Sequence, residues 1–242
     1  DKTYYFDADK ADIRKAYEAH IVKLLQLAGV PADAAAAQAK DVITLETRLA
    51  KASLSSEDLS RDVELYYNPV TLADADKLTP NFSWTEFFKS QGVAAPAMFS
   101  LAMPAFHQEV SRMLADVPLE QWKHYLRFHT LDAAASDLSD EFVAENFDFY
   151  SKTLHGQKEM KPRWKQVLGA INSEAGEAMG QMYVDVAFPP EAKAQMEVLV
   201  DNLGAALKTR IQQLSWMGDD TRKKALAKCF LFGQKAVQPA SL

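Results

Sequence analysis

Two histidines stand close together in the hexapeptide HYLRFH, at positions 124–129, within a segment that has a helical pattern. Metal-binding histidines on a helix are usually four residues apart, which separates the two side chains by about 40° around the helix axis. His124 and His129 are five residues apart, which corresponds to about 140°. In the zinc motif His-Glu-x-x-His the second residue is the general base, but here it is Tyr125. We therefore predict that this pair holds no metal ion and consists of one surface histidine and one histidine at the edge of the core.

The remaining residues capable of chemistry are scattered. Three histidines are isolated in the sequence: His20, His107 and His155. A metal site built from such distant segments stays an open alternative, although histidine is common as a polar residue at the edge of a core. Cys229 has no CxxC partner, so nothing in the sequence marks it as a nucleophile. Glu174 and Glu177 have the spacing of an acid and base pair, but carboxylates at this spacing usually face solvent.

The segment 171–188, INSEAGEAMGQMYVDVAF, is rich in small residues, with Gly176 and Gly180 one helical turn apart. We expect this segment to pack tightly against a neighbouring helix. Close approach of its backbone to a ligand is the alternative. The sequence contains no phosphate-binding glycine loop, dinucleotide fingerprint or nucleophile elbow. The residues by themselves therefore predict no catalytic, cofactor-binding or metal-binding side chain in this chain.

Composition limits the classes of protein to consider. The chain has 242 residues, of which 48% are hydrophobic and 25% charged, as in an ordinary globular protein. Its formal net charge is −6, without long blocks of like charge, which argues against nucleic acid as a partner. No apolar run approaches the roughly 20 residues that cross a bilayer, so we expect no membrane segment. The single cysteine excludes an internal disulfide framework.

The hydrophobic pattern repeats at three and four residues from end to end, which predicts an all-α domain of about eight to ten helices. Helices are expected over 9–28, 31–52, 105–116, 118–129, 140–154, 162–188 and from 190 to about 217, with another starting near Asp219. TLAD (71–74) and SWTE (83–86) fit the capping box, so two short helices should begin there. No stretch alternates with period two, and no Asn-Gly or Asp-Gly turn occurs, so we predict no strands or hairpins.

Several phrases, in this order, resemble one family. LYYNPVTLAD (65–74) followed by FSWTEFF (82–88) is similar to the Tyr-Asn-x-x-Thr-Leu and Phe-x-Trp pair of the neprilysin-like zinc metallopeptidases. The region 149–188 resembles the family's Leu-x-Gly, Arg-Trp and Gly-x-x-Tyr-Val-x-x-x-Phe run, and LSWMGDDTRKKALAK (214–228) its Leu-x-Trp-Met helix. TYYF (3–6) looks like the end of a further family phrase. The resemblance covers residues 3–228, nearly the whole chain.

The resemblance implies a division of labour. In this family the zinc ligands and the general base lie on His-Glu-x-x-His and a later Glu-x-x-x-Asp, in the carboxyl-terminal part of a longer chain. Neither motif occurs here. This chain resembles the helical domain that walls the enclosed substrate cavity, so the resemblance implies no cofactor in this chain and zinc in the parent family's catalytic domain. Its implied partners are peptide substrates and that catalytic domain, in the same chain or a second one.

We predict two segments: a helical peptidase domain over 1–228, incomplete at its start, and a divergent tail over 229–242. By resemblance we expect a portion of a zinc metalloendopeptidase that is inactive alone. A stand-alone binding or dimerisation module, derived from a truncated peptidase, is the alternative, because its exposed face could pair with a second copy. The family's bacterial members are often exported, which makes a periplasmic or extracellular location the expectation, although this sequence shows no export signal.

Overall fold

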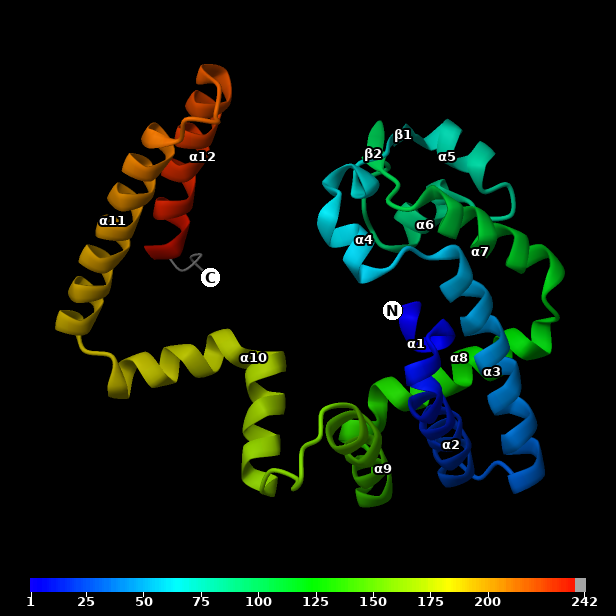
Figure 1. Cartoon of the computed structure of the whole chain (residues 1–242). Coiled ribbons are helices and arrows are strands. Elements are labelled where there is room, and N and C mark those ends of the chain that lie inside the picture. Colours follow the sequence, from blue (N-terminus) through cyan, green and yellow to red (C-terminus); the bar gives the residue numbers. More distant parts are fainter. Residues whose placement is uncertain (238–242) are drawn as a thin grey trace. The chain divides into compact units, whose positions relative to one another are not determined.

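The computed structural model describes residues 1–237, and these confirm the predicted all-α class. The chain divides into two compact units, one covering Asp1–Met160 and the other beginning at Lys161. Figure 1 shows the helices of each unit. Each unit has its own packing, and the polar clusters described below all lie in the first.

The core of the first unit is formed by α2 (Ala11–Leu27), α3 (Ala32–Ala52) and α8 (Leu119–Ala134), which pack against one another (Figure 1). The apolar stripes predicted from the sequence face this core: Ile21 and Leu24 of α2 and Val42 of α3 are fully buried. Phe128 of α8 is also fully buried among them. Burial of such side chains contributes about 1.5–3 kcal/mol each, so this cluster is the main source of stability in the unit.

Local signals set the ends of these helices. Gly29 follows α2 with φ +85°, a left-handed conformation that ends a helix and that glycine adopts without strain. The two predicted helix starts are confirmed: the Thr71 hydroxyl accepts from the Asp74 amide where α5 (Leu72–Leu78) begins. The Ser83 hydroxyl likewise accepts from the Glu86 amide where α6 (Trp84–Ser90) begins. These caps satisfy backbone donors that the first turn leaves free.

The short helix α4 (Ser56–Arg61) has no buried residue. A second, smaller core follows it in the chain and lies among α5, α6 and the segments 69–71 and 98–101, with Ala75, Trp84 and Leu101 buried in it. The prediction of no strands was wrong here. β1 (Pro69–Thr71) pairs antiparallel with β2 (Met98–Ser100), and Val70 is opposite Phe99. Three residues are too few to show a period of two, and the partners are far apart in the sequence. No local pattern could therefore reveal this pair.

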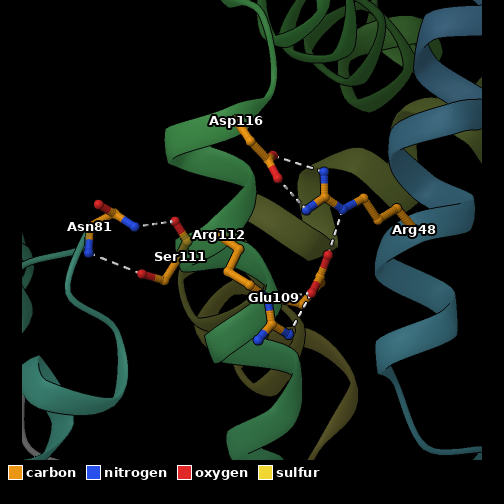
Figure 2. A network of polar contacts seen from close by, with 6 residues as sticks. All are labelled: Arg48, Asn81, Glu109, Ser111, Arg112 and Asp116. Carbon is orange, nitrogen blue, oxygen red and sulfur yellow. Dashed lines mark hydrogen bonds and ion pairs between the residues drawn. The ribbon is translucent and has the colours of Figure 1, made fainter.

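The helix α7 (Pro104–Asp116) joins the two cores through the polar network of Figure 2. Arg48 of α3 binds Asp116 in a bidentate pair, with both N–O distances 2.8 Å. Glu109 accepts from Arg48 and also from Arg112, 2.8 Å from its Nε. Asn81, which precedes α6, donates to the Ser111 hydroxyl and carbonyl at 3.0 and 2.9 Å. Bidentate arginine pairs are directional, so this network sets how α7 lies against α3.

After α8 the chain forms α9 (Asp140–Asn146), which continues into a π-helix, η4 (Phe147–Leu154). The predicted single helix over 140–154 is thus an α-helix that widens into a π-helix. Gly156 then ends the segment with φ +69°. A π-helix turns its side chains by a different angle per residue than an α-helix. The widening places Phe149 in the core, where it is buried, and Tyr150 beside it.

Up to residue 237, the second unit contains three long helices, α10 (Arg163–Ala187), α11 (Pro190–Gln213) and α12 (Asp219–Val237). The break at Pro189-Pro190 falls where the sequence indicated: α10 ends before it, Pro189 is the N-cap of α11 and Pro190 is its first residue. Within α10, Ala175 departs from helical geometry with φ −135° and ψ 30°. The expected tight packing at Gly176 and Gly180 was wrong for the described residues, because a Cβ at either glycine would meet no atom within 4 Å.

The predicted boundary after residue 228 stays a prediction. The helix α12 runs from Asp219 to Val237, across that position. Residues 238–242 of the predicted tail lie outside the described residues. Within residues 1–237 the structure contains no helix with both the length and the apolar character needed to cross a membrane.

Candidate functional site

One group of polar side chains surrounds the buried Glu46 of α3, which is only 7% exposed. Its carboxylate accepts hydrogen bonds from the hydroxyl of Tyr5, at 3.0 Å, and from that of Tyr17, at 2.9 Å. Nε2 of His129 lies 2.9 Å from the same carboxylate, at an angle outside hydrogen-bond geometry. We call these four residues the Glu46 cluster. A buried carboxylate is costly unless it is paired, and here two donors from α1 (Thr3–Phe6) and α2 pair with it.

The tyrosines of this cluster are held in their neutral form. Burial raises the pKa of Tyr5 and Tyr17 far above the ordinary value, and the neighbouring charge of Glu46 raises both further. Burial likewise raises the pKa of Tyr125 on α8. A phenol with a raised pKa is a poor general base and a poor nucleophile. The cluster is therefore suited to holding α1, α2, α3 and α8 together, and not to proton transfer at neutral pH.

A second polar group surrounds His20 of α2, which is 1% exposed. Its Nδ1 lies 2.9 Å from Glu145 on α9, and its Nε2 lies 3.0 Å from Asp132 on α8. A neutral imidazole has one N–H donor, so both contacts are hydrogen bonds together only if the ring or a carboxyl carries an additional proton. Tyr150 donates to Asp132 at 2.6 Å, and Phe149 stacks on the imidazole with centroids 4.7 Å apart. These contacts tie the π-helix to α2 and α8.

The two histidines of HYLRFH do not converge. Nδ1 of His124 lies 2.7 Å from Asp41, whereas His129 faces Glu46. The His124 side chain is 21% exposed and the His129 side chain 39%, so His129 is the more exposed of the two. Both also reach the same neighbouring helix, α3, which the angle of about 140° did not indicate. The explanation is that Asp41 and Glu46 are themselves five residues apart, so each histidine finds its own carboxylate.

The other candidate residues stand apart from these clusters. His107 packs against Trp84, with ring centroids 5.3 Å apart, and burial lowers its pKa. His155 is exposed, and its Nδ1 lies 2.6 Å from the Tyr150 carbonyl. Glu174 and Glu177 are exposed on α10, and Cys229 is a half-buried free thiol on α12.

Among residues 1–237 no three His, Cys, Asp or Glu side chains are grouped so that they could hold a metal ion. His20, for example, has a carboxylate on each ring nitrogen and leaves neither free for a ligand bond. A catalytic zinc needs three protein ligands with an open fourth position. The residues present therefore do not fit a zinc centre, and no step of zinc chemistry is assigned to them.

A cavity of about 470 Å3 adjoins the Glu46 cluster. It lies among α1, the first turns of α2, Ile43 of α3 and the π-helix. Its lining is mainly apolar and includes the rings of Tyr5, Tyr17 and Tyr150. A second hollow beside it, of about 700 Å3, lies between α2 and the segment formed by α9 and the π-helix, and is lined by charged residues of both signs, including Lys15 and Asp148.

A family model described as peptidase family M13 matches residues 1–239. The chain belongs to peptidase family M13. This confirms the resemblance to the neprilysin-like zinc metallopeptidases that the sequence phrases carry.

Individual members of peptidase family M13 match nearly all of this chain. Endothelin-converting enzyme-like 1 of Rattus norvegicus is 30% identical over 235 residues, which cover 94% of this chain and 30% of that protein. Neutral endopeptidase of Lactobacillus helveticus is 25% identical over 228 residues, which cover 94% and 35%. The crystal structure of zinc metalloprotease ZMP1 of Mycobacterium tuberculosis with an inhibitor is similar with a TM-score of 0.80 at 33% identity. That match covers 95% of this chain and 35% of the protease. The chain thus spans about a third of the length of these family M13 relatives.

Sequence reasoning missed Glu46 and the role of His20. A signal for Glu46 was present: it follows Val42 by four residues and Leu45 by one, so it lies on the apolar stripe of α3. A charged residue on such a stripe indicates a buried, paired side chain. Its partners carry no comparable signal, because Tyr5, Tyr17 and His129 come from three separate segments.

Proposed function

We propose that this chain is the non-catalytic helical domain of a family M13 zinc metalloendopeptidase, and that it walls the cavity in which peptides are held. The observation that carries the proposal is the family match over residues 1–239, which covers only about a third of the relatives. The catalytic part, with zinc on His-Glu-x-x-His, would be supplied by the same polypeptide or by a second one. This chain would contribute shape and apolar surface, and no zinc ligand.

The surface of the second unit supports a partner of this kind. On α10 four apolar residues at helical spacing are all exposed: Trp164, Val167, Leu168 and Ile171. On α11 a second exposed stripe is formed by Met196, Leu199, Leu203 and Leu207. Neither helix has a buried residue among the described side chains. Contiguous exposed apolar surface of this extent marks an interaction site.

The first test concerns zinc and activity. Elemental analysis of the purified chain, paired with its intact mass, is expected to show no stoichiometric zinc. A fluorogenic peptide should not be cleaved by the chain alone. One zinc per chain, or chelator-sensitive cleavage by the chain alone, would overturn the proposal, and the histidines described above would have to be reconsidered as ligands.

The second test concerns the partner. A tagged chain purified from its own cells is expected to carry His-Glu-x-x-His, either on the same polypeptide or on a co-purifying one. Leu199→Glu with Leu203→Glu should abolish the contact with the catalytic part, whereas Lys208→Glu, a charge reversal elsewhere on α11, should not. A concentration-dependent dimer without any catalytic partner, measured by sedimentation, would favour the dimerisation module instead.

A further inference from the structure

The cavity beside the Glu46 cluster has an apolar floor. Its deeper lining is half-buried or buried and consists of aromatic and aliphatic side chains: Tyr5, Tyr17, Ile43, Phe149, Tyr150 and Leu154. Its volume of about 470 Å3 lies within the range of roughly 300–1,000 Å3 typical of pockets that bind small molecules. The floor is assembled from α1, α2, α3 and the π-helix, which the Glu46 cluster and the contacts of His20 hold together.

The polar atoms of this floor are already occupied. The hydroxyls of Tyr5 and Tyr17 both donate to Glu46, and that of Tyr150 donates to Asp132. Burial raises the pKa of these phenols, so they stay neutral and keep these hydrogen bonds. The floor therefore offers a ligand only apolar contacts, with the carbon atoms of its aromatic rings and aliphatic side chains. Tyrosine rings in such positions make large, rigid apolar contacts.

The charges at the cavity lie at its rim. Lys15 and Glu18, on the first turns of α2, line it and are exposed to solvent. Arg14 is occupied by the carbonyls of Tyr4 and Asp7, at 2.9 and 2.8 Å. A charged ligand group in the floor would lose its water and gain no free partner, which is costly. A ligand that places an apolar group on the floor and a polar chain across the rim would match the apolar lining below and the charged, solvent-exposed residues above.

We propose that this cavity binds one large apolar side chain, aromatic or branched aliphatic, of a peptide that lies across its rim. The inference rests on the proposed function and deepens it, because it assigns to the helical wall a contact with the peptide itself. The ring faces of the tyrosines and Phe149 would enclose the side chain. The peptide main chain would keep its polar groups in water and near Lys15 and Glu18.

The test is a titration of the whole chain, followed by amide NMR. The probes are N-acetyl-phenylalanine amide, a short glycine–serine peptide with one central phenylalanine, and the same peptide with glycine in its place. Both phenylalanine probes are expected to shift resonances of residues 11–18 and 149–154. They should bind roughly ten- to a hundredfold more tightly than the glycine peptide, as expected for burying one such side chain.

Matched variants keep the result interpretable. Ala11→Trp places bulk in the cavity, because Ala11 lines it, whereas Ala8→Trp adds the same bulk to an exposed residue outside it. We expect Ala11→Trp to weaken binding at least about tenfold and Ala8→Trp to leave it unchanged. Ile43→Trp, with the exposed Thr44→Trp as its control, repeats the comparison from α3. Thermal unfolding shows which variants are folded.

The outcomes separate the two proposals. Binding that Ala11→Trp and Ala8→Trp weaken equally, or no binding of either phenylalanine probe, would overturn this inference. Binding of the small amide without the phenylalanine peptide would also overturn it, because the cavity would then not accept a side chain carried on a main chain. None of these results affects the proposed helical wall, which depends on the zinc, activity and co-purification measurements.

Discussion

Replacing Glu46 by glutamine tests whether its buried carboxylate holds the helices together. The substitution preserves the shape of the side chain and removes its charge. Two tyrosine hydroxyls donate to this carboxylate, at 3.0 and 2.9 Å. Hydrogen bonds to a charged group contribute about 1.5–3 kcal/mol each, and neutral ones about 0.5–1.5. Losing the charge removes part of two such bonds but also relieves the cost of burying a carboxylate.

The net expectation follows from these opposed effects. Glu46→Gln should lower the free energy of unfolding of the first unit by about 1–2 kcal/mol. Glu46→Ala should lower it by about 3–4 kcal/mol, because it also leaves a cavity and two buried hydroxyls without an acceptor. The order of the two variants is a stricter test than either value.

Urea unfolding followed by amide NMR provides the measurement, because resonances of α2 and α3 report on the first unit alone. Glu159→Gln is the matched control, since Glu159 is exposed and its side chain makes no hydrogen bond in the described structure. If Glu46→Gln were as stable as the original chain, or if Glu159→Gln lost as much, the view that the carboxylate stabilises the cluster would be refuted.

Four further predictions concern the same elements. Phe128→Ala should cost about 3–5 kcal/mol of unfolding free energy in urea titrations, because the ring is fully buried. The folded-state pKa of Tyr17 is raised. The neutral Tyr17 hydroxyl therefore stabilises the fold below about pH 10, and this stabilisation is lost as the pH rises further. Tyr17→Phe should therefore flatten the fall in unfolding free energy above pH 10 by roughly 1.4 kcal/mol per pH unit. The Arg48 guanidinium lowers the pKa of Glu109 in the folded state. The ion pair of Glu109 therefore stabilises the fold above the ordinary glutamate pKa of about 4.3, and this stabilisation is lost as the pH falls below that value. Glu109→Gln should remove that part of the acid dependence in pH-dependent unfolding. Finally, the chain should bind the dye ANS through its exposed stripes, and Leu203→Glu, at a side chain 62% exposed, should reduce the fluorescence without lowering stability.

The sequence by itself determined the features that depend on near neighbours. Helix positions followed from apolar spacing, as in Ile21 and Leu24 of α2, and their ends followed from Gly29, Thr71 and Ser83. These signals act within one or two turns, so a local pattern contains them. The order of the phrases from TYYF to LSWMGDD was also enough to identify the family, because order and spacing survive where overall identity is near 30%.

Only the tertiary structure decided which side chains of those helices are covered and which pair with one another across helices. Periodicity correctly predicted α11, but it could not show that Leu203 has no cover among the described residues. Glu46 stood on a readable stripe, yet its partners Tyr5, Tyr17 and His129 are brought to it by three different segments. Which side chains pair across helices depends on how the helices pack and on their relative register. That register is set by the whole core, so no short stretch of the sequence records it.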